Sequence, residues 1–250
     1  MAGRSFNSIA FKSSCPNPRS CPLKYDVILF DAAETLFTTR GSVGEIYGDI
    51  ARNYGSHASA GEIQTAFLNQ FRHSGPLRTE SEKQWWREVV HGVFTEVGMV
   101  ANFDRFFEEV YEQFRDNRGW KLFPETLPVL NELRQRGYRL GVVSNFDSRI
   151  YSVLESLEIL RFFDSITISS EAGFAKPEPG IFHEAIRSAG VPSSRILYIG
   201  DSLSNDVLAG EAAGIHSILI DRNQTRNVAR PIEVIENLWE IPNHILTPSI

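Results

Sequence analysis

The sequence predicts an α/β protein in which a doubly wound parallel sheet is interrupted by an inserted, all-helical segment. Three observations predict this class. Five short apolar runs punctuate the chain, helical patterns alternate with them after Trp120, and the stretch between Phe37 and Trp120 contains helical patterns only. Continuous apolar strands separated by helices are typical of a parallel sheet covered on both faces, as in Rossmann-like folds.

The five predicted strands are short runs in which Val, Ile and Leu predominate. They occupy Val27–Phe30, Leu140–Ser144, Ile166–Ser169, Ile196–Ile199 and Ser217–Ile220. Helices are predicted between the later strands. Pro124 begins the first and Gly137 ends it, since Pro is favoured in the first turn of a helix and Gly just after its last residue. The others run from about Asp147 to Glu158, from Pro179 to Gly190 and from Ser204 to Gly214.

The stretch between Phe37 and Trp120 carries apolar residues at helical spacing. Three amphipathic stripes are evident: Ile63, Phe67, Leu68 and Phe71; Trp85, Val89, Val93, Phe94 and Val97; and Phe103, Phe106, Phe107, Val110, Tyr111 and Phe114. We therefore expect a four-helix cap domain over residues 40–118, whose aromatic side chains form its own core. The α/β core is expected to comprise residues 25–39 and 119–250.

The composition is that of a folded protein without membrane spans. Of the 250 residues, 42% are hydrophobic and 17 are Phe, which is ample for a buried core. No apolar run approaches the roughly 20 residues that span a bilayer, so we expect no membrane partner. The net charge of −6 argues against a general nucleic-acid binder, which needs basic stripes to neutralise phosphates. Nothing in the sequence indicates an oligomeric state.

The first 24 residues differ from the rest, because they contain four basic residues and five Ser but none of the 31 acidic residues. Such a leader resembles an organelle transit peptide, which would place the protein in a chloroplast or mitochondrion. The alternative is an unstructured tail on a cytoplasmic protein. Cys15 and Cys21 lie in this leader, and we expect reduced thiols because no nearby residues complete a four-ligand zinc site. The fold is expected to begin near Lys24.

Polar residues follow the predicted strands at their carboxyl ends, where open parallel sheets bind ligands. Asp31 and Thr35 follow the first strand, and Ser144 and Asn145 end the second. The fourth strand leads into Asp201 and Asp206, and Lys176 lies in the Ala-Lys-Pro-Glu-Pro segment that precedes it; the sequence thus places carboxylate, hydroxyl and ammonium groups at one rim.

Each of these groups suits phosphoryl transfer. A carboxylate can attack phosphorus and form an acyl phosphate, which divides one difficult step into two. Both reactants are anionic, so their approach needs a cation, and Mg²⁺ prefers oxygen ligands such as carboxylates and a backbone carbonyl. A Lys and a Ser hydroxyl can stabilise the equatorial oxygens of the transferred group. The pattern therefore predicts Mg²⁺-dependent phosphoryl transfer.

The whole set of motifs, in this order, resembles the haloacid dehalogenase superfamily over about residues 25–220. The position of the helical segment resembles its subfamily with a cap after the first motif. Within the superfamily the chain looks closest to the group called haloacid dehalogenase-like hydrolase domain-containing protein 3. The resemblance implies a hydrolase, with a small phosphorylated metabolite as the expected substrate.

The resemblance also implies roles for individual residues. Asp31 matches the nucleophile, which would form an aspartyl-phosphate, and Ser144 and Lys176 match the other catalytic residues. Thr35 and Asn145 fall at positions expected to contact substrate. The expected Mg²⁺ ligands are Asp31, Asp201 and the backbone carbonyl of Ala33, with Asp206 in support.

One position departs from the family pattern. Phosphatases of the family carry a second Asp two residues after the nucleophile as a general acid–base, but here that residue is Ala33, and Glu34 replaces the usual Gly. Loss of a general acid–base costs about 10²–10⁴ in rate. Glu34 is a candidate to replace the missing general acid–base. Because it is the next residue in the chain, however, we expect its side chain to point away from the position that the Asp would occupy.

Three interpretations follow from this departure. The first is a slow or leaving-group-selective phosphatase, and the second is a binding or regulatory protein without turnover. The third is a phosphonatase-like enzyme, which would need a cap lysine; Lys83 and Lys121 are the candidates. Asp201 and Asp206 argue against dehalogenase chemistry, because family dehalogenases depart from this acidic pair.

Overall fold

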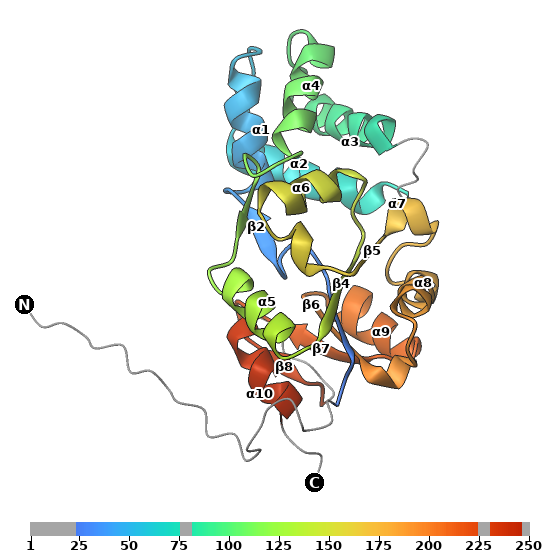
Figure 1. The fold of residues 1–250 in the computed structure, drawn as a ribbon. Coiled ribbons are helices and arrows are strands. Elements are labelled where there is room, and N and C mark those ends of the chain that lie inside the picture. The colour runs from blue at the N-terminus through green and yellow to red at the C-terminus, as the bar shows by residue number, and fades with distance from the viewer. Residues whose placement is uncertain (1–23, 76–81, 225–230, 247–250) are drawn as a thin grey trace, which may run out of the picture.

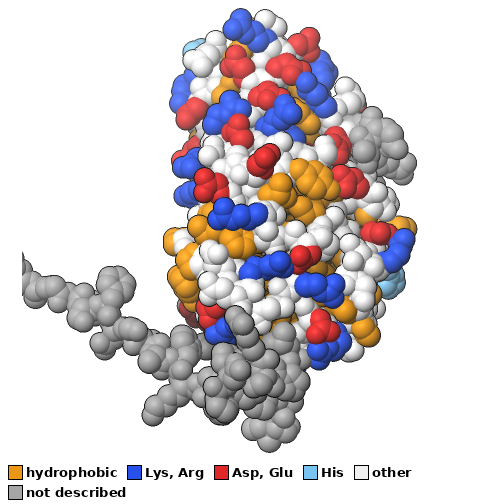
Figure 2. Space-filling view, in the orientation of Figure 1, with side chains coloured by type: hydrophobic (Ala, Val, Ile, Leu, Met, Phe, Trp, Pro, Cys, Tyr) orange, Lys and Arg blue, Asp and Glu red, His pale blue; other side chains and the backbone are white. Residues whose placement is uncertain are grey.

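The structure, a computed structural model, describes residues 24–75, 82–224 and 231–246. Most of the predicted leader, with Cys15 and Cys21, lies outside the described residues. None of the helices in these ranges combines the length and the apolar character that a membrane span requires. On the face drawn in Figure 2, Lys and Arg side chains are interspersed with Asp and Glu side chains.

The central sheet is parallel throughout and has six strands in the order β5-β4-β1-β6-β7-β8. The strands are β1 (Val27–Phe30), β4 (Arg139–Ser144), β5 (Ser165–Ile168), β6 (Ile196–Gly200), β7 (His216–Ile220) and β8 (Val234–Ile235). All five predicted strands are present. The expectation of five strands was one too few, because β8 has only two residues and no pattern that the sequence reveals.

Helices cover both faces of the central sheet (Figure 1), because alternate apolar side chains of its strands point to opposite faces. Ile28 and Phe30 belong to a core cluster that includes residues of α5 (Thr126–Gln135), α6 (Arg149–Ser156) and α10 (Ile241–Leu246). Val27 and Leu29 belong to a second cluster with α8 (Pro179–Ala189) and α9 (Ala209–Ala212). Successive side chains of a strand point to opposite faces, so β1 is buried on both. The predicted doubly wound, Rossmann-like class is confirmed.

The predicted helix ends agree with the structure to within a few residues. α8 begins at Pro179 and ends before Gly190, whose φ of 65° is the left-handed conformation that glycine adopts freely. α5 begins two residues after Pro124. The single helix predicted from Ser204 to Gly214 is instead a π-helical turn, η4 (Leu203–Leu208), that continues into α9. Short helical elements complete the chain: η2 (Leu160–Phe162), α7 (Ser169–Ala172), η3 (Ser193–Arg195) and η5 (Leu238–Glu240).

The inserted segment lies between two short strands that pair with each other and not with the central sheet. β2 (Phe37–Thr39) and β3 (Trp120–Leu122) are antiparallel. Between them the described residues form α1 (Val43–Arg52), α2 (Ala60–His73), α3 (Glu82–Val97) and α4 (Phe103–Gln113), which gather at one end of the molecule (Figure 1). Ser42 and Ser59 begin α1 and α2 with reciprocal capping boxes to Glu45 and Glu62.

Most residues of the predicted apolar stripes form the interior of this helical group. Phe94 and Phe106 are fully buried, and their rings meet edge-on with centroids 4.7 Å apart. Two residues of the first stripe do not follow the prediction: Leu68 is 48% exposed and Phe71 is 44% exposed. α2 therefore buries a narrower face than its sequence indicates.

Candidate active site

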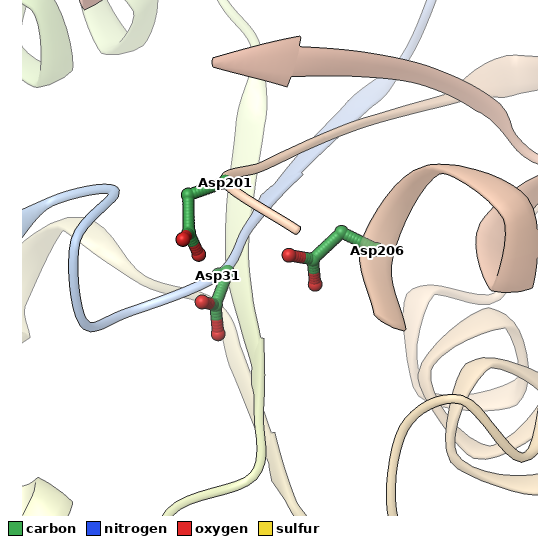
Figure 3. A group of neighbouring side chains, drawn as sticks. All are labelled: Asp31, Asp201 and Asp206. Carbon is green, nitrogen blue, oxygen red and sulfur yellow. The ribbon is translucent and has the colours of Figure 1, made fainter. Parts of the chain in front are cut away.

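Three aspartates meet at the carboxyl ends of β1 and β6. Asp31 directly follows β1, Asp201 follows β6, and Asp206 lies in η4. The Asp31 N–H donates to the carbonyl of Ile199 at 2.8 Å, which aligns the two strand ends. One carboxylate oxygen from each aspartate lies within 4.8 Å of the others, and Figure 3 shows the three side chains converging. The structure thus brings these predicted residues together.

Lys176 lies inside this cluster. Its buried ammonium nitrogen is 2.7 Å from an oxygen of Asp31 and 2.7 Å from an oxygen of Asp206. Although burial lowers it, the charges of Asp206 and Asp31 raise the pKa of Lys176 above its ordinary value. The lysine is therefore a permanent cation that partly compensates the two buried carboxylates.

The donor set fits a hard divalent cation. Burial foremost raises the pKa of Asp31, and the charge of Asp206 adds to the rise while the charge of Lys176 opposes it. Three carboxylates against one ammonium group leave a negative charge that a divalent cation would offset. Asp206 already accepts from Lys176 and from Tyr198 at 2.6 Å through one oxygen, and from the Ser202 N–H at 2.8 Å through the other. That saturation suits a supporting part for Asp206.

Tyr198 is a member of the site that sequence analysis did not single out. Its hydroxyl lies 2.6 Å from Asp206, 3.1 Å from the Lys176 ammonium and 3.2 Å from the carbonyl of Val143. Burial foremost, and then the charges of Asp206 and Asp31, raise the pKa of Tyr198 well above its ordinary value, so the phenol stays protonated. The only available signal was one polar side chain within the buried Ile-Leu-Tyr-Ile strand, since buried Tyr hydroxyls usually have a partner.

Gly200 allows Asp206 to approach the end of β6. A Cβ at this position would lie 2.3 Å from the Asp206 Cγ, well inside van der Waals contact. Any larger residue would displace the carboxylate and its hydrogen bonds to Lys176 and Tyr198. Glycine at position 200 is thus required by the space available.

Ser144 and Asn145 lie at the same edge of the sheet, where β4 ends. Ser144 is buried, at 4% exposure. The Asn145 amide binds the Lys176 backbone at both ends: its Nδ2 donates to the Lys176 carbonyl at 2.8 Å, and its Oδ1 accepts from the Lys176 N–H at 2.7 Å. Asn145 therefore fixes the loop that carries the lysine. Its contact with substrate remains a prediction, since both ends of the amide are occupied in this geometry.

The loop after Asp31 places Ala33 and Thr35 differently. Ala33 is half-buried and forms an isolated β-bridge with Phe37. Thr35 is fully buried, and its hydroxyl has no hydrogen-bond partner among the described residues. A substrate would reach the Thr35 side chain only if the loop moved, so its predicted contact with substrate also remains untested.

Glu34 lies on the surface beside this loop. Its carboxylate accepts from the Thr38 hydroxyl at 2.7 Å, and the residue is exposed. Its backbone has the left-handed φ of 59°, and its N–H donates to the Phe37 carbonyl at 2.7 Å. The positive φ gives a physical reason for the Gly that the family carries here. In this conformation the carboxylate bonds within its own loop rather than with the aspartate cluster.

Trp86 and Tyr111 of the helical group contact a buried ion pair of the core, which lies just after Ser144 and Asn145 in the chain. Arg149 and Asp147 are 8% and 1% exposed, and their charged groups lie 2.6 Å apart. The Arg149 guanidinium lies over the rings of Trp86 and Tyr111, at 5.1 and 4.1 Å from their centroids, and Trp86 donates to Asp147. From the start of α3, Glu82 accepts from the Ser148 N–H at 3.0 Å.

Neither Lys83 of the insertion nor Lys121 at its edge bonds to the aspartate cluster. Lys83 forms an exposed ion pair with Glu108 at 2.7 Å and lies 5.3 Å from the Tyr111 ring centroid. Lys121 is exposed in the middle of β3. The position of Lys83 disfavours the phosphonatase-like interpretation, which requires a lysine that reaches the substrate.

A doubly wound sheet with an Asp–Lys–Asp cluster at its carboxyl edge and helices inserted after the first strand defines a class of hydrolases. The family described as haloacid dehalogenase-like hydrolase matches residues 25–214, and the chain belongs to this family. The predicted resemblance is confirmed.

Two relatives and a solved structure agree with this placement. The chain is 30% identical over 227 residues to haloacid dehalogenase-like hydrolase domain-containing protein 3 of Danio rerio, covering 86% of this chain and 94% of the relative. It is 29% identical to a glyceraldehyde 3-phosphate phosphatase of Methanothermobacter thermautotrophicus, covering 79% and 86%. The Bacillus subtilis putative HAD-hydrolase YfnB, solved bound to magnesium, has a TM-score of 0.71 at 20% identity and covers 90% and 100%, which shows the shared fold.

Proposed function

We propose that the chain is a slow or leaving-group-selective phosphatase that acts on a small phosphorylated metabolite through an aspartyl-phosphate at Asp31. The observation that carries the proposal is the buried Lys176 ammonium between Asp31 and Asp206, with Asp201 beside them. The named activity of the Methanothermobacter relative supports a phosphate ester as the substrate.

In the first step, a carboxylate oxygen of Asp31 attacks phosphorus and the bond from phosphorus to the ester oxygen breaks. Lys176 holds the attacking carboxylate by a 2.7 Å hydrogen bond and brings positive charge to a site of anions. Asp31, Asp201 and the Ala33 carbonyl would hold Mg²⁺, with Asp206 in support. When bound, the ion supplies the charge that lets an anionic substrate approach.

The departing alkoxide needs a proton, and Ala33 offers none. A carboxylate at that position would protonate the leaving oxygen and then activate the water that attacks the acyl phosphate. Without it, water must serve both purposes, and the expected loss is about 10²–10⁴ in rate for poor leaving groups. Acyl and aryl phosphates need less protonation and are the expected better substrates.

The division of the chain into a cap of residues 40–118 and a core of residues 25–39 and 119–250 is part of this proposal. The cap would select the substrate, because Trp86 and Glu82 contact the loop after β4 beside the aspartates. A second candidate function is that of a binding or regulatory protein. The absence of a carboxylate on Ala33, together with the hydrogen bond that Thr38 donates to Glu34, favours it.

The test is an assay of the purified full chain with Mg²⁺ against phosphate esters of graded leaving-group pKa and against phosphonates. We expect turnover that rises steeply as the leaving group becomes more acidic, with none on phosphonates. Asp31→Asn should abolish it, because the amide is a poor nucleophile. Absence of turnover on every ester, in a folded protein that binds Mg²⁺, would establish the binding protein instead.

A further inference from the structure

Arg222 connects the end of β7 to the loop that follows Asp31. Its Nη2 donates to the Thr35 carbonyl at 2.7 Å, and its Nε donates to the Glu34 carbonyl at 3.2 Å. Its Nη1 donates to the Glu125 carboxylate at 2.6 Å, and its guanidinium lies 3.4 Å from the Phe123 ring centroid. The Arg222 side chain, only 16% exposed, thus donates hydrogen bonds from all three guanidinium nitrogens and packs one face of the guanidinium on Phe123.

The rest of this loop is fixed at both ends by other groups. Asp31 is tied to β6 by its backbone, and the Leu36 carbonyl accepts from the Thr126 hydroxyl at 2.6 Å. Between these anchors, Arg222 binds the carbonyls of Glu34 and Thr35. It therefore acts on the part of the loop that has the least favourable backbone conformation.

That conformation is the left-handed φ of 59° at Glu34. A residue with a Cβ disfavours it, and glycine does not. The φ of Glu34 and the ψ of Ala33 together set the plane of the peptide bond between them. This plane carries the Ala33 carbonyl, so a change of φ at Glu34 turns that carbonyl away.

We propose that Arg222 is a positioning residue: it holds the left-handed turn at Glu34 and so aims the Ala33 carbonyl at the site of Asp31. The inference rests on the proposed function, because it concerns the loop that would hold Mg²⁺. It explains how this chain keeps a Glu where the turn favours glycine.

The arrangement requires arginine rather than lysine. A guanidinium is planar, so it binds two carbonyls and a carboxylate along its edge while one face stacks on Phe123. An ammonium group has no flat face and does not span all three acceptors at once. Glu125 is the N-cap residue of α5, so the clamp also ties the loop to a helix of the core.

The experiment compares Arg222→Gln, Arg222→Lys, Glu34→Gly and the double variant Arg222→Gln with Glu34→Gly in the full chain. Isothermal titration with Mg²⁺ and hydrogen exchange of the Glu34 and Leu36 amides are the readouts, beside kcat and KM. Both amides are hydrogen-bonded within the loop, to Phe37 and Ala32, so their exchange reports its conformation. Arg195→Gln is the matched control, because Arg195 also binds a carboxylate, of Asp26, and a carbonyl, of Lys24, at the opposite edge of the sheet.

We expect Arg222→Gln and Arg222→Lys to weaken Mg²⁺ binding by roughly tenfold, as loss of a group that orients a metal ligand does, and to speed exchange of both amides. Glu34→Gly in the Gln background should restore most of the Mg²⁺ affinity, since glycine adopts the turn unaided. Arg195→Gln should leave Mg²⁺ affinity and loop exchange unchanged.

Unchanged Mg²⁺ affinity and exchange in both folded Arg222 variants would overturn the proposal. So would a loss that Glu34→Gly does not repair, because the turn would then not be what Arg222 maintains. Both readouts are independent of turnover, so a chain that hydrolyses no phosphate ester still decides the matter. Should the Gln variant fail to fold, the Lys variant, which keeps the charge opposite Glu125, gives the same comparison.

Discussion

The ammonium nitrogen of Lys176 lies 2.7 Å from a carboxylate oxygen of Asp31, although 145 positions separate the two residues in the chain. The pair is buried, and an oxygen of a second carboxylate, of Asp206, also lies 2.7 Å from the ammonium nitrogen. Removing one partner of a buried ion pair leaves uncompensated charge, which is far more costly than losing an exposed pair. The central lysine therefore contributes to stability as well as to chemistry.

Lys176→Met tests this contribution directly. With EDTA present, we expect the free energy of unfolding to fall by about 3 kcal/mol, because Asp31 and Asp206 then face each other without a cation. Mg²⁺ should reduce the difference in the free energy of unfolding between the variant and the wild type, since the ion offsets the repulsion between the two carboxylates. Urea unfolding with Mg²⁺ and with EDTA measures both values.

Lys83→Met provides the control, because Lys83 forms an ion pair with Glu108 in which both side chains are about half exposed. Its loss should change stability by no more than about 0.5 kcal/mol, with or without Mg²⁺. If Mg²⁺ raised the free energy of unfolding equally in the wild type, Lys176→Met and Lys83→Met, the assignment of the ion to the aspartate cluster would be contradicted.

Tyr198→Phe removes one hydroxyl and keeps the ring that packs edge-on against Phe182, with centroids 5.0 Å apart. We expect a loss of about 1 kcal/mol in the free energy of unfolding and a fall in kcat larger than any change in KM. The reason is that the hydroxyl bonds to Asp206 and Lys176 rather than facing a substrate.

Thermal unfolding and steady-state kinetics measure these changes. Tyr151→Phe is the matched control, since Tyr151 donates to the Glu171 carboxylate at the surface, at 2.9 Å. If the two Phe variants behave alike, the Tyr198 hydroxyl has no part in positioning the site.

Arg149→Lys tests the contact between the inserted helices and the core, in which Trp86 and Tyr111 pack on Arg149; we call this contact the seam. The change keeps the charge but loses the paired hydrogen bonds to Asp147 and the flat face against Tyr111, so we expect the free energy of unfolding to fall by about 2 kcal/mol. KM for phosphate esters should rise more than kcat falls, because the seam orients the cap and not the nucleophile.

Arg87→Lys is the corresponding change on the surface of the inserted helices, in α3. Arg87 pairs with Asp104 and lies over the Phe103 ring at 5.2 Å, but it does not reach the core. Denaturant melts and substrate titrations of both variants give the comparison. Equal KM values in the two would argue against a part for the seam in substrate binding.

The convergence of Asp31, Asp201 and Asp206 could be predicted because it follows from strand order. Apolar runs separated by helices indicate a parallel sheet, and the ends of parallel strands meet at one edge. Lys176 could be placed there only through its motif, since its loop has no periodic pattern.

Other features depend on contacts that no local pattern encodes. Arg222 is one basic residue after a strand, and its partners at Glu34 and Thr35 lie 188 and 187 positions away. Tyr198 fits an apolar strand as well as a polar site. The exposure of Phe71 and Leu68 depends on how α2 packs against α1 and α3, which helical spacing alone does not determine.

Ala33→Asp tests the central claim most directly, namely that phosphatase chemistry is present and lacks only its proton carrier. The measurement is kcat for an alkyl phosphate and for an activated aryl phosphate, in the variant and in the wild type, with Mg²⁺. We expect a gain of about 10²–10⁴ in kcat on the alkyl ester and a much smaller gain on the aryl ester, whose leaving group needs little protonation. A folded variant that binds Mg²⁺ and gains nothing on either ester would contradict the account.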